Sequence, residues 1–291
     1  MDSLELLRKV RKIEVFTKGL SNHIFSGEYH SAFKGRGMSF SEVRDYTYGD
    51  DVRNIDWNVT ARTGSPHIKI FEEERELTVM LLIDVSGSSY FGSKDVFKSE
   101  WMAEISAVIA FSALTNHDKV GAILFSDRIE KYLPPAKGRQ NLLRIIREVL
   151  NLKPVGKRTS LESALKFLNN VEKKRSIAFV FSDFFDDGYR QALNVTAKKH
   201  DIIGVRIYDD REEFIPYGGL IAIEDAESGK VTLLDTASPQ YKAKAKTIYD
   251  SKVNDFIKTF HASKSDVMHL ATGQDYIVAL QKFFKNRALR K

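Results

Sequence analysis

An aspartate and two serines stand where an apolar run ends, in the stretch LTVMLLIDVSGSSYFGS from Leu77 to Ser93. Asp84 closes the apolar run, and Ser86 and Ser88 follow it at alternate positions. A buried strand has no structural need for a carboxylate and two hydroxyls at its tip. Mg²⁺ is a hard cation that prefers six oxygen ligands and keeps several waters. These three side chains are therefore a suitable partial ligand set for such an ion.

Two further oxygen-bearing residues follow in the same kind of position. Thr159, in VGKRTSLESAL, comes just before an expected helix, and Asp183, in FVFSDFFDD, ends another apolar run. Taken singly, each signal is weak, since Asp, Ser and Gly are common in the turns after strands and threonine is a common helix N-cap. Their order along the chain predicts one metal site, made of Asp84, Ser86, Ser88, Thr159 and Asp183.

The elements that must position these residues alternate along the chain. Short apolar runs predict strands over residues 77–84, 119–126, 176–183 and 201–209. Helical periodicity predicts helices over 95–114, 139–151, 160–174 and 189–200. This alternation predicts right-handed crossovers and a doubly wound, mostly parallel α/β sheet. Ligands bind such sheets at the carboxyl ends of the strands, which is where Asp84 and Asp183 lie.

The two ends of the chain depart from this rhythm. Residues 218–236 (GGLIAIEDAESGKVTLLDT) predict a β-hairpin insertion, which we expect to extend an edge of the sheet. A long helix around 241–260, a strand over 266–271 and a helix over 275–288 complete the chain. Residues 1–75 have little periodicity and a dense polar stretch. We expect them to form an irregular, partly β appendage packed on a main domain at 76–291.

Composition places limits on the setting of the protein. A hydrophobic fraction of 43% in 291 residues is enough for a core without disulfide or metal staples. The absence of cysteine fits a reducing compartment. The N-terminal residues carry charges throughout, unlike a signal peptide. No apolar run approaches the roughly 18–20 residues that span a bilayer. We expect a cytoplasmic protein with no membrane span.

The predicted ligand set resembles a known binding site. In order and strand-tip context it is similar to the metal-ion-dependent adhesion site of von Willebrand factor A domains. The resemblance implies that the serines and the threonine contact the ion directly or through water, and that the aspartates act through bridging waters. It implies Mg²⁺, or Mn²⁺ or Ca²⁺ in its place. It also implies binding rather than catalysis, with a carboxylate of a partner protein filling an open position on the ion.

A second resemblance lies before the first predicted strand. The stretch GRGMSFSEVRDYTYGDDVRNIDWNVTARTGSPHIKIFEEERE is similar to the signature of a bacterial family, domain of unknown function family fifty-eight. The matching elements are Arg44, Tyr46, GDDVRNIDW at Gly49–Trp57, Ala61-Arg62, FEEERE, and EDAESGKVTLLDT in the hairpin. Members of that family are often encoded beside AAA+ ATPases of the MoxR type. The resemblance therefore implies a partner or adaptor of such an ATPase, in a chaperone-like or stress role.

The charged residues of this signature allow two interpretations. Arg44, Asp50, Asp51, Arg53, Asp56 and Arg62 carry balancing signs. They suit a network of charge-assisted hydrogen bonds that pins an irregular segment against the main domain. They also suit a docking surface beside the metal edge. We favour the structural interpretation, because nothing in the segment indicates a catalytic geometry.

Two other function classes compete with a binding module. A metal-dependent hydrolase acting on phosphoesters is the first, with Asp183, Asp186 and Asp187 as its acids. Against it, Ser86 stands where one phosphatase class needs a second acid, and the chain has no G-x-S-x-G, phosphate-binding loop or H-E-x-x-H pattern. A nucleic-acid binder is the second, and it rests only on the net charge of +6 and pI of 9.2. We therefore expect a non-enzymatic protein that binds another protein and no nucleic acid.

Overall fold

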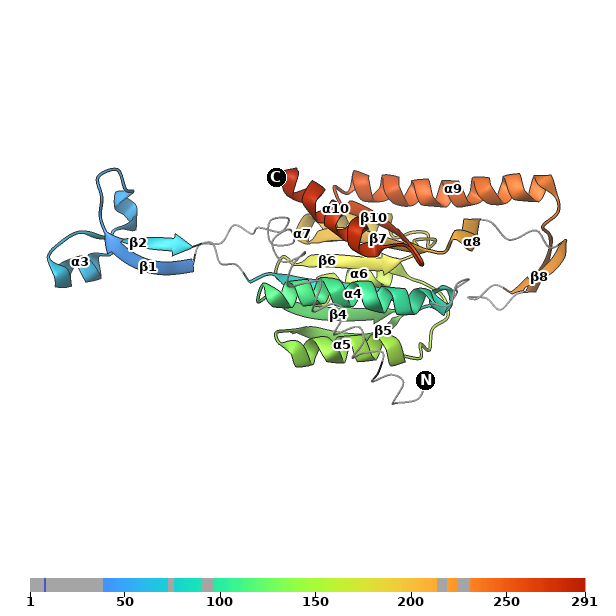
Figure 1. The fold of residues 1–291 in the computed structure, drawn as a ribbon, viewed down its shortest axis with the longest axis horizontal. Helices are drawn as coiled ribbons and strands as arrows, with labels where there is room; N and C mark the ends of the chain where they lie inside the picture. Colours follow the sequence, from blue (N-terminus) through green and yellow to red (C-terminus); the bar gives the residue numbers. More distant parts are fainter. Residues whose placement is uncertain are drawn as a thin grey trace. The chain divides into compact units, whose positions relative to one another are not determined.

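The computed structural model describes Arg8 and residues 39–72, 76–90, 97–213, 219–224 and 231–290 (Figure 1). They form two compact units, with the boundary between Leu77 and Thr78. The larger unit carries the predicted metal site. The smaller unit carries the charged signature.

A six-stranded sheet forms the centre of the larger unit. Its strand order is β10-β7-β6-β3-β4-β5, and only the β4–β5 pair is antiparallel. The predicted doubly wound, mostly parallel α/β sheet is confirmed. The central strands are buried from end to end, as continuous apolar runs predict for a sheet covered on both faces. The strands are β3 (Thr78–Asp84), β4 (Lys119–Phe125), β5 (Ile129–Ala136), β6 (Ile177–Ser182), β7 (Asp201–Tyr208) and β10 (Asp266–Ala271).

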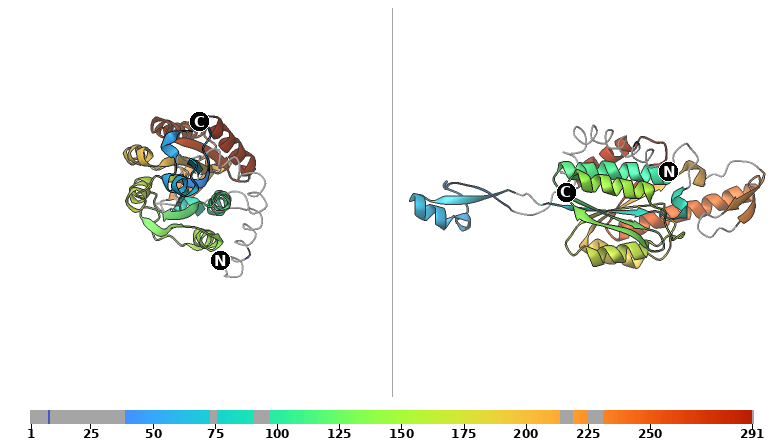
Figure 2. Two further views of the ribbon diagram at one scale, coloured as in Figure 1. Left: turned by 90° about the vertical axis from the view of Figure 1, so that its left-hand side faces the viewer. Right: turned by 90° about the horizontal axis from the view of Figure 1, so that it is seen from below.

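Helices cover both faces of this sheet (Figure 2). Side chains of α6, α7 and α9 pack into one core cluster with Met80 and Leu82 of β3. The helices α4 and α5 pack against each other on the opposite face, and Trp101 of α4 contacts the ring of Tyr276 at the start of α10, with 5.2 Å between ring centroids. The helices are α4 (Lys98–Thr115), α5 (Arg139–Asn151), α6 (Leu161–Val171), α7 (Arg190–Lys199), α8 (Asp210–Glu213), α9 (Pro239–Ala262) and α10 (Tyr276–Leu289).

The predicted hairpin is present, but its predicted place in the sheet is wrong. Strands β8 (Leu220–Glu224) and β9 (Val231–Asp235) pair with each other as a separate two-stranded sheet. Leu220, Val231 and Leu233 are 59–69% exposed. A strand that joined the main sheet would bury one face against covering helices, whereas the described side chains of β8 and β9 are exposed or only half-buried. Figure 1 shows the hairpin and the amino-terminal half of α9 extending past the carboxyl ends of the parallel strands.

The smaller unit is a β-ribbon closed by short helices. Strands β1 (Ser39–Asp45) and β2 (His67–Glu72) pair antiparallel, and η2 (Val52–Asn54) and α3 (Trp57–Thr63) lie between them in sequence. Asp56 caps α3 by accepting from the backbone N–H of Asn58 and Val59, and Gly64 ends the helix in a left-handed conformation. The two regular strands replace much of the irregular backbone that we predicted here.

Charged side chains of the signature bind each other within this unit. The Arg44 guanidinium donates to both oxygens of Asp50 at 2.8 and 2.9 Å, and Asp50 also accepts from the backbone N–H of Thr47. These bonds lower the pKa of Asp50 well below its ordinary value. Arg53 binds Asp51 in the same forked manner. The network therefore holds the 44–53 turn, while its predicted packing on the main domain stays a prediction.

One buried histidine gives the main fold a testable pH dependence. His200, 1% exposed, accepts a hydrogen bond from the backbone N–H of Ser176, so its ring is neutral. Burial, together with the charges of Lys199 and Arg175, lowers its pKa to about 4. Because the unfolded chain binds this proton near pH 6.5, the contribution of His200 to the free energy of unfolding should fall between pH 6.5 and 4 and stay constant below that.

Urea unfolding of the wild type, His200→Gln and His261→Gln across this pH range measures the effect. We expect the free energy of unfolding to depend less steeply on pH in His200→Gln but not in His261→Gln, because His261 is exposed. An unchanged slope in His200→Gln would show that another group is responsible.

Candidate metal centre

Two neighbouring strands bring the predicted carboxylates together. Strands β3 and β6 pair in parallel, with Ile83 opposite Phe181, so their carboxyl ends meet at one edge. Asp84 is the last residue of β3, and Asp183 directly follows β6. Both are nearly inaccessible, at 2% and 7% exposed. The structure thus places two like charges side by side in a buried position.

The predicted hydroxyl ligands surround Asp84. The Ser86 backbone N–H donates to Asp84 Oδ1 at 2.9 Å, and the Ser86 hydroxyl lies 3.2 Å from that of Ser88. Thr159 Oγ1 lies 2.8 Å from Ser86 Oγ and 3.4 Å from Asp84 Oδ2. Ser88 also donates a hydrogen bond to Asp183. All five predicted residues therefore converge at this edge, although their binding of a metal stays a prediction.

The loop that carries Thr159 is held from two sides. The backbone N–H of Gly87 donates to Lys157 O at 3.0 Å, and that of Ser160 donates to Ser126 O at 2.9 Å. Glu130 accepts from the Ser126 hydroxyl and from the backbone N–H of Gly156. A Cβ on Gly156 would lie 2.2 Å from Ser126 Oγ and 2.1 Å from Asp127 Oδ1, so any other residue would displace these two side chains. These contacts fix Thr159 against the β3 loop.

A buried lysine and two further polar residues complete the edge. Lys98, 1% exposed at the start of α4, pairs with Asp183 at 3.2 Å and with Glu212 of α8. The Ser182 hydroxyl donates to Asp84 Oδ2 at 2.7 Å. Sequence analysis missed all three residues. Lys98 and Glu212 are ordinary surface residue types on helices, and Ser182 differs from other strand-end serines only in its partner.

Burial and neighbouring charges shift the pKa values of the two aspartates in opposite directions. Burial, followed by the negative charge of Asp183, raises the pKa of Asp84 above its ordinary value. Burial would also raise the pKa of Asp183, but the Lys98 ammonium, the Phe185 N–H and the Ser88 hydroxyl lower it below its ordinary value. The strand edge therefore holds Asp183 as a firmly ionised carboxylate, beside Asp84, whose negative charge is poorly compensated.

The donor set fits a hard divalent cation. Mg²⁺–oxygen bonds of about 2.1 Å place neighbouring octahedral ligands about 3 Å apart. The hydroxyl and carboxylate oxygens of Asp84, Ser86, Ser88 and Thr159 are spaced at 2.8–3.4 Å. Within the described residues, no cluster of three or more His, Cys, Asp or Glu side chains could hold a metal. The arrangement thus suits a cation that accepts hydroxyls and water, rather than a transition metal bound by nitrogen or sulfur.

Comparison with known proteins identifies the family. The family model described as "Protein of unknown function DUF58" matches residues 42–253. The chain belongs to this family.

A relative and two solved structures are similar to this DUF58 chain. An uncharacterized protein of Mycobacterium bovis is 28% identical over 99% of this chain and 91% of the relative. The conserved hypothetical protein BatB from Bacteroides thetaiotaomicron matches at a TM-score of 0.46 and 12% identity, over 74% of this chain and all of BatB. The VWA domain of SpRpn10 matches at 0.38 and 13%, over 75% of this chain and 96% of that domain.

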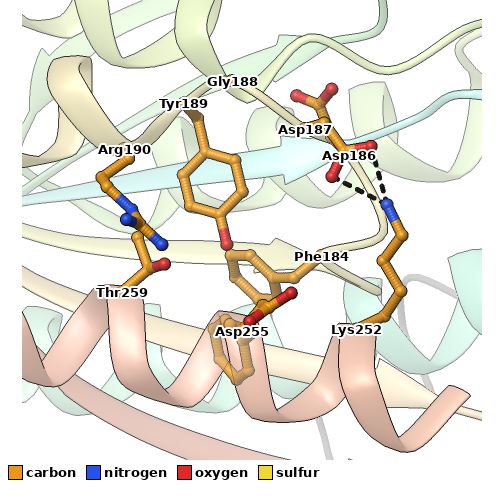
Figure 3. Close-up of a pocket in the computed structure, with 10 residues that line it drawn as sticks. Phe184, Asp186, Asp187, Gly188, Tyr189, Arg190, Lys252, Asp255 and Thr259 are labelled. Atoms are coloured by element: carbon orange, nitrogen blue, oxygen red, sulfur yellow. Dashed lines mark hydrogen bonds and ion pairs between the residues drawn. The ribbon is translucent and has the colours of Figure 1, made fainter. Parts of the chain in front are cut away.

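Two of the three acids of the alternative hydrolase, Asp186 and Asp187, line another pocket of this DUF58 protein, whereas Asp183 lies beside Asp84. A cavity of about 120 Å³ is lined by Asp186, Asp187 and Tyr189 with residues of α9 (Figure 3). Asp186 accepts from the backbone N–H of Leu161 and caps α6, and Asp187 pairs with Lys252 at 2.7 Å. Both carboxylates therefore have structural partners, and neither belongs to the Asp84 cluster.

Replacement of the buried lysine should strongly destabilise the main domain. Lys98→Met leaves Asp183 and Glu212 buried without their shared cation, and we expect a loss of about 3–5 kcal/mol in the free energy of unfolding. Adding Glu212→Gln to Lys98→Met should recover part of the loss, because one of the two carboxylates is then neutral. Denaturant unfolding measures all three proteins. A loss below about 1 kcal/mol in Lys98→Met would contradict this role of the ion pair.

Replacement of Gly156 tests the support of the Thr159 loop. Gly156→Ala must displace Ser126 or Asp127, so we expect a destabilisation of about 1–3 kcal/mol. Val155→Ala, one residue earlier and 73% exposed, should change stability by less than about 0.5 kcal/mol. Thermal unfolding of both variants provides the comparison. Equal effects would show that the close approach at Gly156 is not structurally important.

Proposed function

We propose that this DUF58 protein is a non-enzymatic, metal-dependent protein-binding module. Mg²⁺, or Mn²⁺ or Ca²⁺ in its place, is the cation we propose. The observation that carries the proposal is the convergence of Asp84, Ser86, Ser88, Thr159 and Asp183 at one strand edge, with oxygens spaced for an octahedral ion. The poorly compensated negative charge at Asp84 supports it, since a cation there relieves the repulsion from Asp183.

Each residue has a defined task in this mechanism. The hydroxyls of Ser86, Ser88 and Thr159 supply neutral oxygens, and the two aspartates orient the remaining shell. Because the hydroxyls add no negative charge, the site leaves a divalent cation with part of its positive charge. A cation held by these residues would offer a Lewis-acidic position to a partner's carboxylate. Lys98 keeps Asp183 ionised and fixes its orientation.

The partner we propose is an AAA+ ATPase of the MoxR type, in a chaperone-like or stress role in the cytoplasm. Family membership supports this proposal, through the association that the signature resemblance implies. Among the described helices, none is both long enough and apolar enough to cross a membrane. Any other protein with an acidic residue at its surface would offer the same carboxylate to the proposed metal centre.

Titration calorimetry with Mg²⁺ and Mn²⁺ tests the proposal. We expect one saturable site in the wild type that is lost in Asp84→Ala and in Thr159→Ala, because each variant removes an oxygen of the cluster. At a hundredfold excess of ion over the dissociation constant, the wild type should gain about 2.7 kcal/mol of stability. Asp187→Ala is the matched control, since Asp187 is a carboxylate in the separate pocket.

The result that contradicts the proposal is equally specific. If the wild type binds no ion at millimolar concentration, the five residues act only as turns and caps. If Asp187→Ala abolishes ion binding while Asp84→Ala keeps it, the ion belongs to the pocket of Asp186 and Asp187. Phosphoester turnover lost in the same variant would then favour the hydrolase.

A further inference from the structure

A large apolar groove adjoins the proposed metal centre. Its volume is about 520 Å³, and it lies among the loop after β6, α8, β9 and the amino-terminal half of α9. Phe185 lines it two residues after Asp183, and Glu212, which lines it from α8, shares Lys98 with Asp183. The groove and the strand edge are therefore neighbouring parts of one surface in the larger unit.

The groove exists because α9 extends beyond the sheet. Its lining residues on α9 include Tyr241, Ala245, Ile248 and Lys252, whose spacing of three and four residues puts them on one face of the helix. Farther along α9, Phe256 and Phe260 are buried in the core against β7. The amino-terminal half of α9 extends past the carboxyl ends of the parallel strands, and Ile248 is 54% exposed there.

The aromatic wall of the groove is held in place from below. The guanidinium of Arg206, 3% exposed on β7, donates to the Tyr249 hydroxyl at 2.8 Å. It lies 5.7 Å from the Phe185 ring centroid and 5.2 Å from that of Tyr249. These two rings also contact each other edge to face. A wall that is already ordered loses little entropy when a ligand binds.

The charge around the groove selects an acidic occupant. Residues 239–252 carry four lysines and one acidic residue, and Lys244 and Lys252 line the groove itself. Glu212 is the one acid among the lining residues that the structure describes, and it shares the Lys98 ammonium with Asp183. The groove therefore has an apolar floor and a basic wall, and it lies beside the proposed carboxylate-binding cation. These features are complementary to an acidic segment that carries a large apolar side chain.

We propose that this groove docks an acidic peptide segment of a partner protein, with an aliphatic or aromatic side chain in the groove and a neighbouring carboxylate at the metal centre. The proposal rests on the proposed function and adds the sequence chemistry of the partner. The groove supplies the apolar contact, Lys244 attracts the flanking acids, and a cation held at the strand edge would anchor one carboxylate.

Two synthetic peptides probe the groove in the presence of Mg²⁺. One is acetyl-Asp-Glu-Leu-Phe-Asp-Glu-amide, and the other has Ser-Ser in place of Leu-Phe. Fluorescence anisotropy with labelled peptides should show at least about tenfold tighter binding of the Leu-Phe peptide, because burial of one such side chain is worth that much. Ile248→Asp should remove most of this difference, whereas Lys244→Glu should weaken the binding of both peptides, because they share the flanking acids.

Matched controls on another helix separate the groove from general surface effects. Val278→Asp and Lys282→Glu change exposed side chains of α10, and Val278 is 59% exposed, close to the 54% of Ile248. Both controls should bind the Leu-Phe peptide like the wild type. Far-ultraviolet circular dichroism checks that all four variants remain folded.

The outcomes separate the groove from the metal centre. If both peptides bind alike to the wild type and to Ile248→Asp, or neither binds although the ion does, the docking proposal is overturned and the metal centre stands. If binding depends on Ile248 and Lys244 but is unaffected by Asp84→Ala or by chelator, the groove is supported and the metal-dependent function fails. A dimer in light scattering that Ile248→Asp converts to monomer would assign the groove to a second copy of the chain and overturn the proposal.

Discussion

The burial of two carboxylates at adjacent strand tips is the constraint on which the rest of the structure depends. Asp84 and Asp183 are almost inaccessible and repel each other. Transfer of such charges out of water is costly unless each gains a partner. Lys98 supplies a cation to Asp183, whereas Asp84 accepts from neutral hydrogen-bond donors, namely Ser86, Thr159 and Ser182. This asymmetry leaves a place beside Asp84 where a second positive charge is favourable.

The surrounding elements serve to keep that place fixed. The β4–β5 turn and the loop before α6 are joined through Ser126, Glu130 and the close approach at Gly156, which sets the position of Thr159. On the other side, α8 returns Glu212 to Lys98, and α9 extends the surface beyond the strand ends. The same chain segments therefore build both the polar edge and the apolar groove. One partner segment would contact both.

Sequence patterns predicted the fold and the converging residues because both depend on local signals. Continuous apolar runs defined the parallel strands, and Asp84, Ser86 and Ser88 lie on a single loop. Lys98 and Glu212 were missed because their meeting depends on the packing of α4 against the loop after β7, which no local spacing encodes. The hairpin was predicted from its turn residues, but the prediction that it extends an edge of the main sheet was wrong. Whether a hairpin pairs with the main sheet depends on which sheet edge the chain reaches, and the side-chain pattern of the hairpin does not specify that edge.

Anomalous diffraction from crystals grown with Mn²⁺ would locate a divalent cation without relying on any variant. We expect one strong peak enclosed by Asp84, Ser86, Ser88, Thr159 and Asp183, about 2–2.5 Å from the nearest hydroxyl oxygens. A peak in the pocket of Asp186 and Asp187, or an empty strand edge in crystals that hold Mn²⁺ elsewhere, would contradict the proposed metal centre.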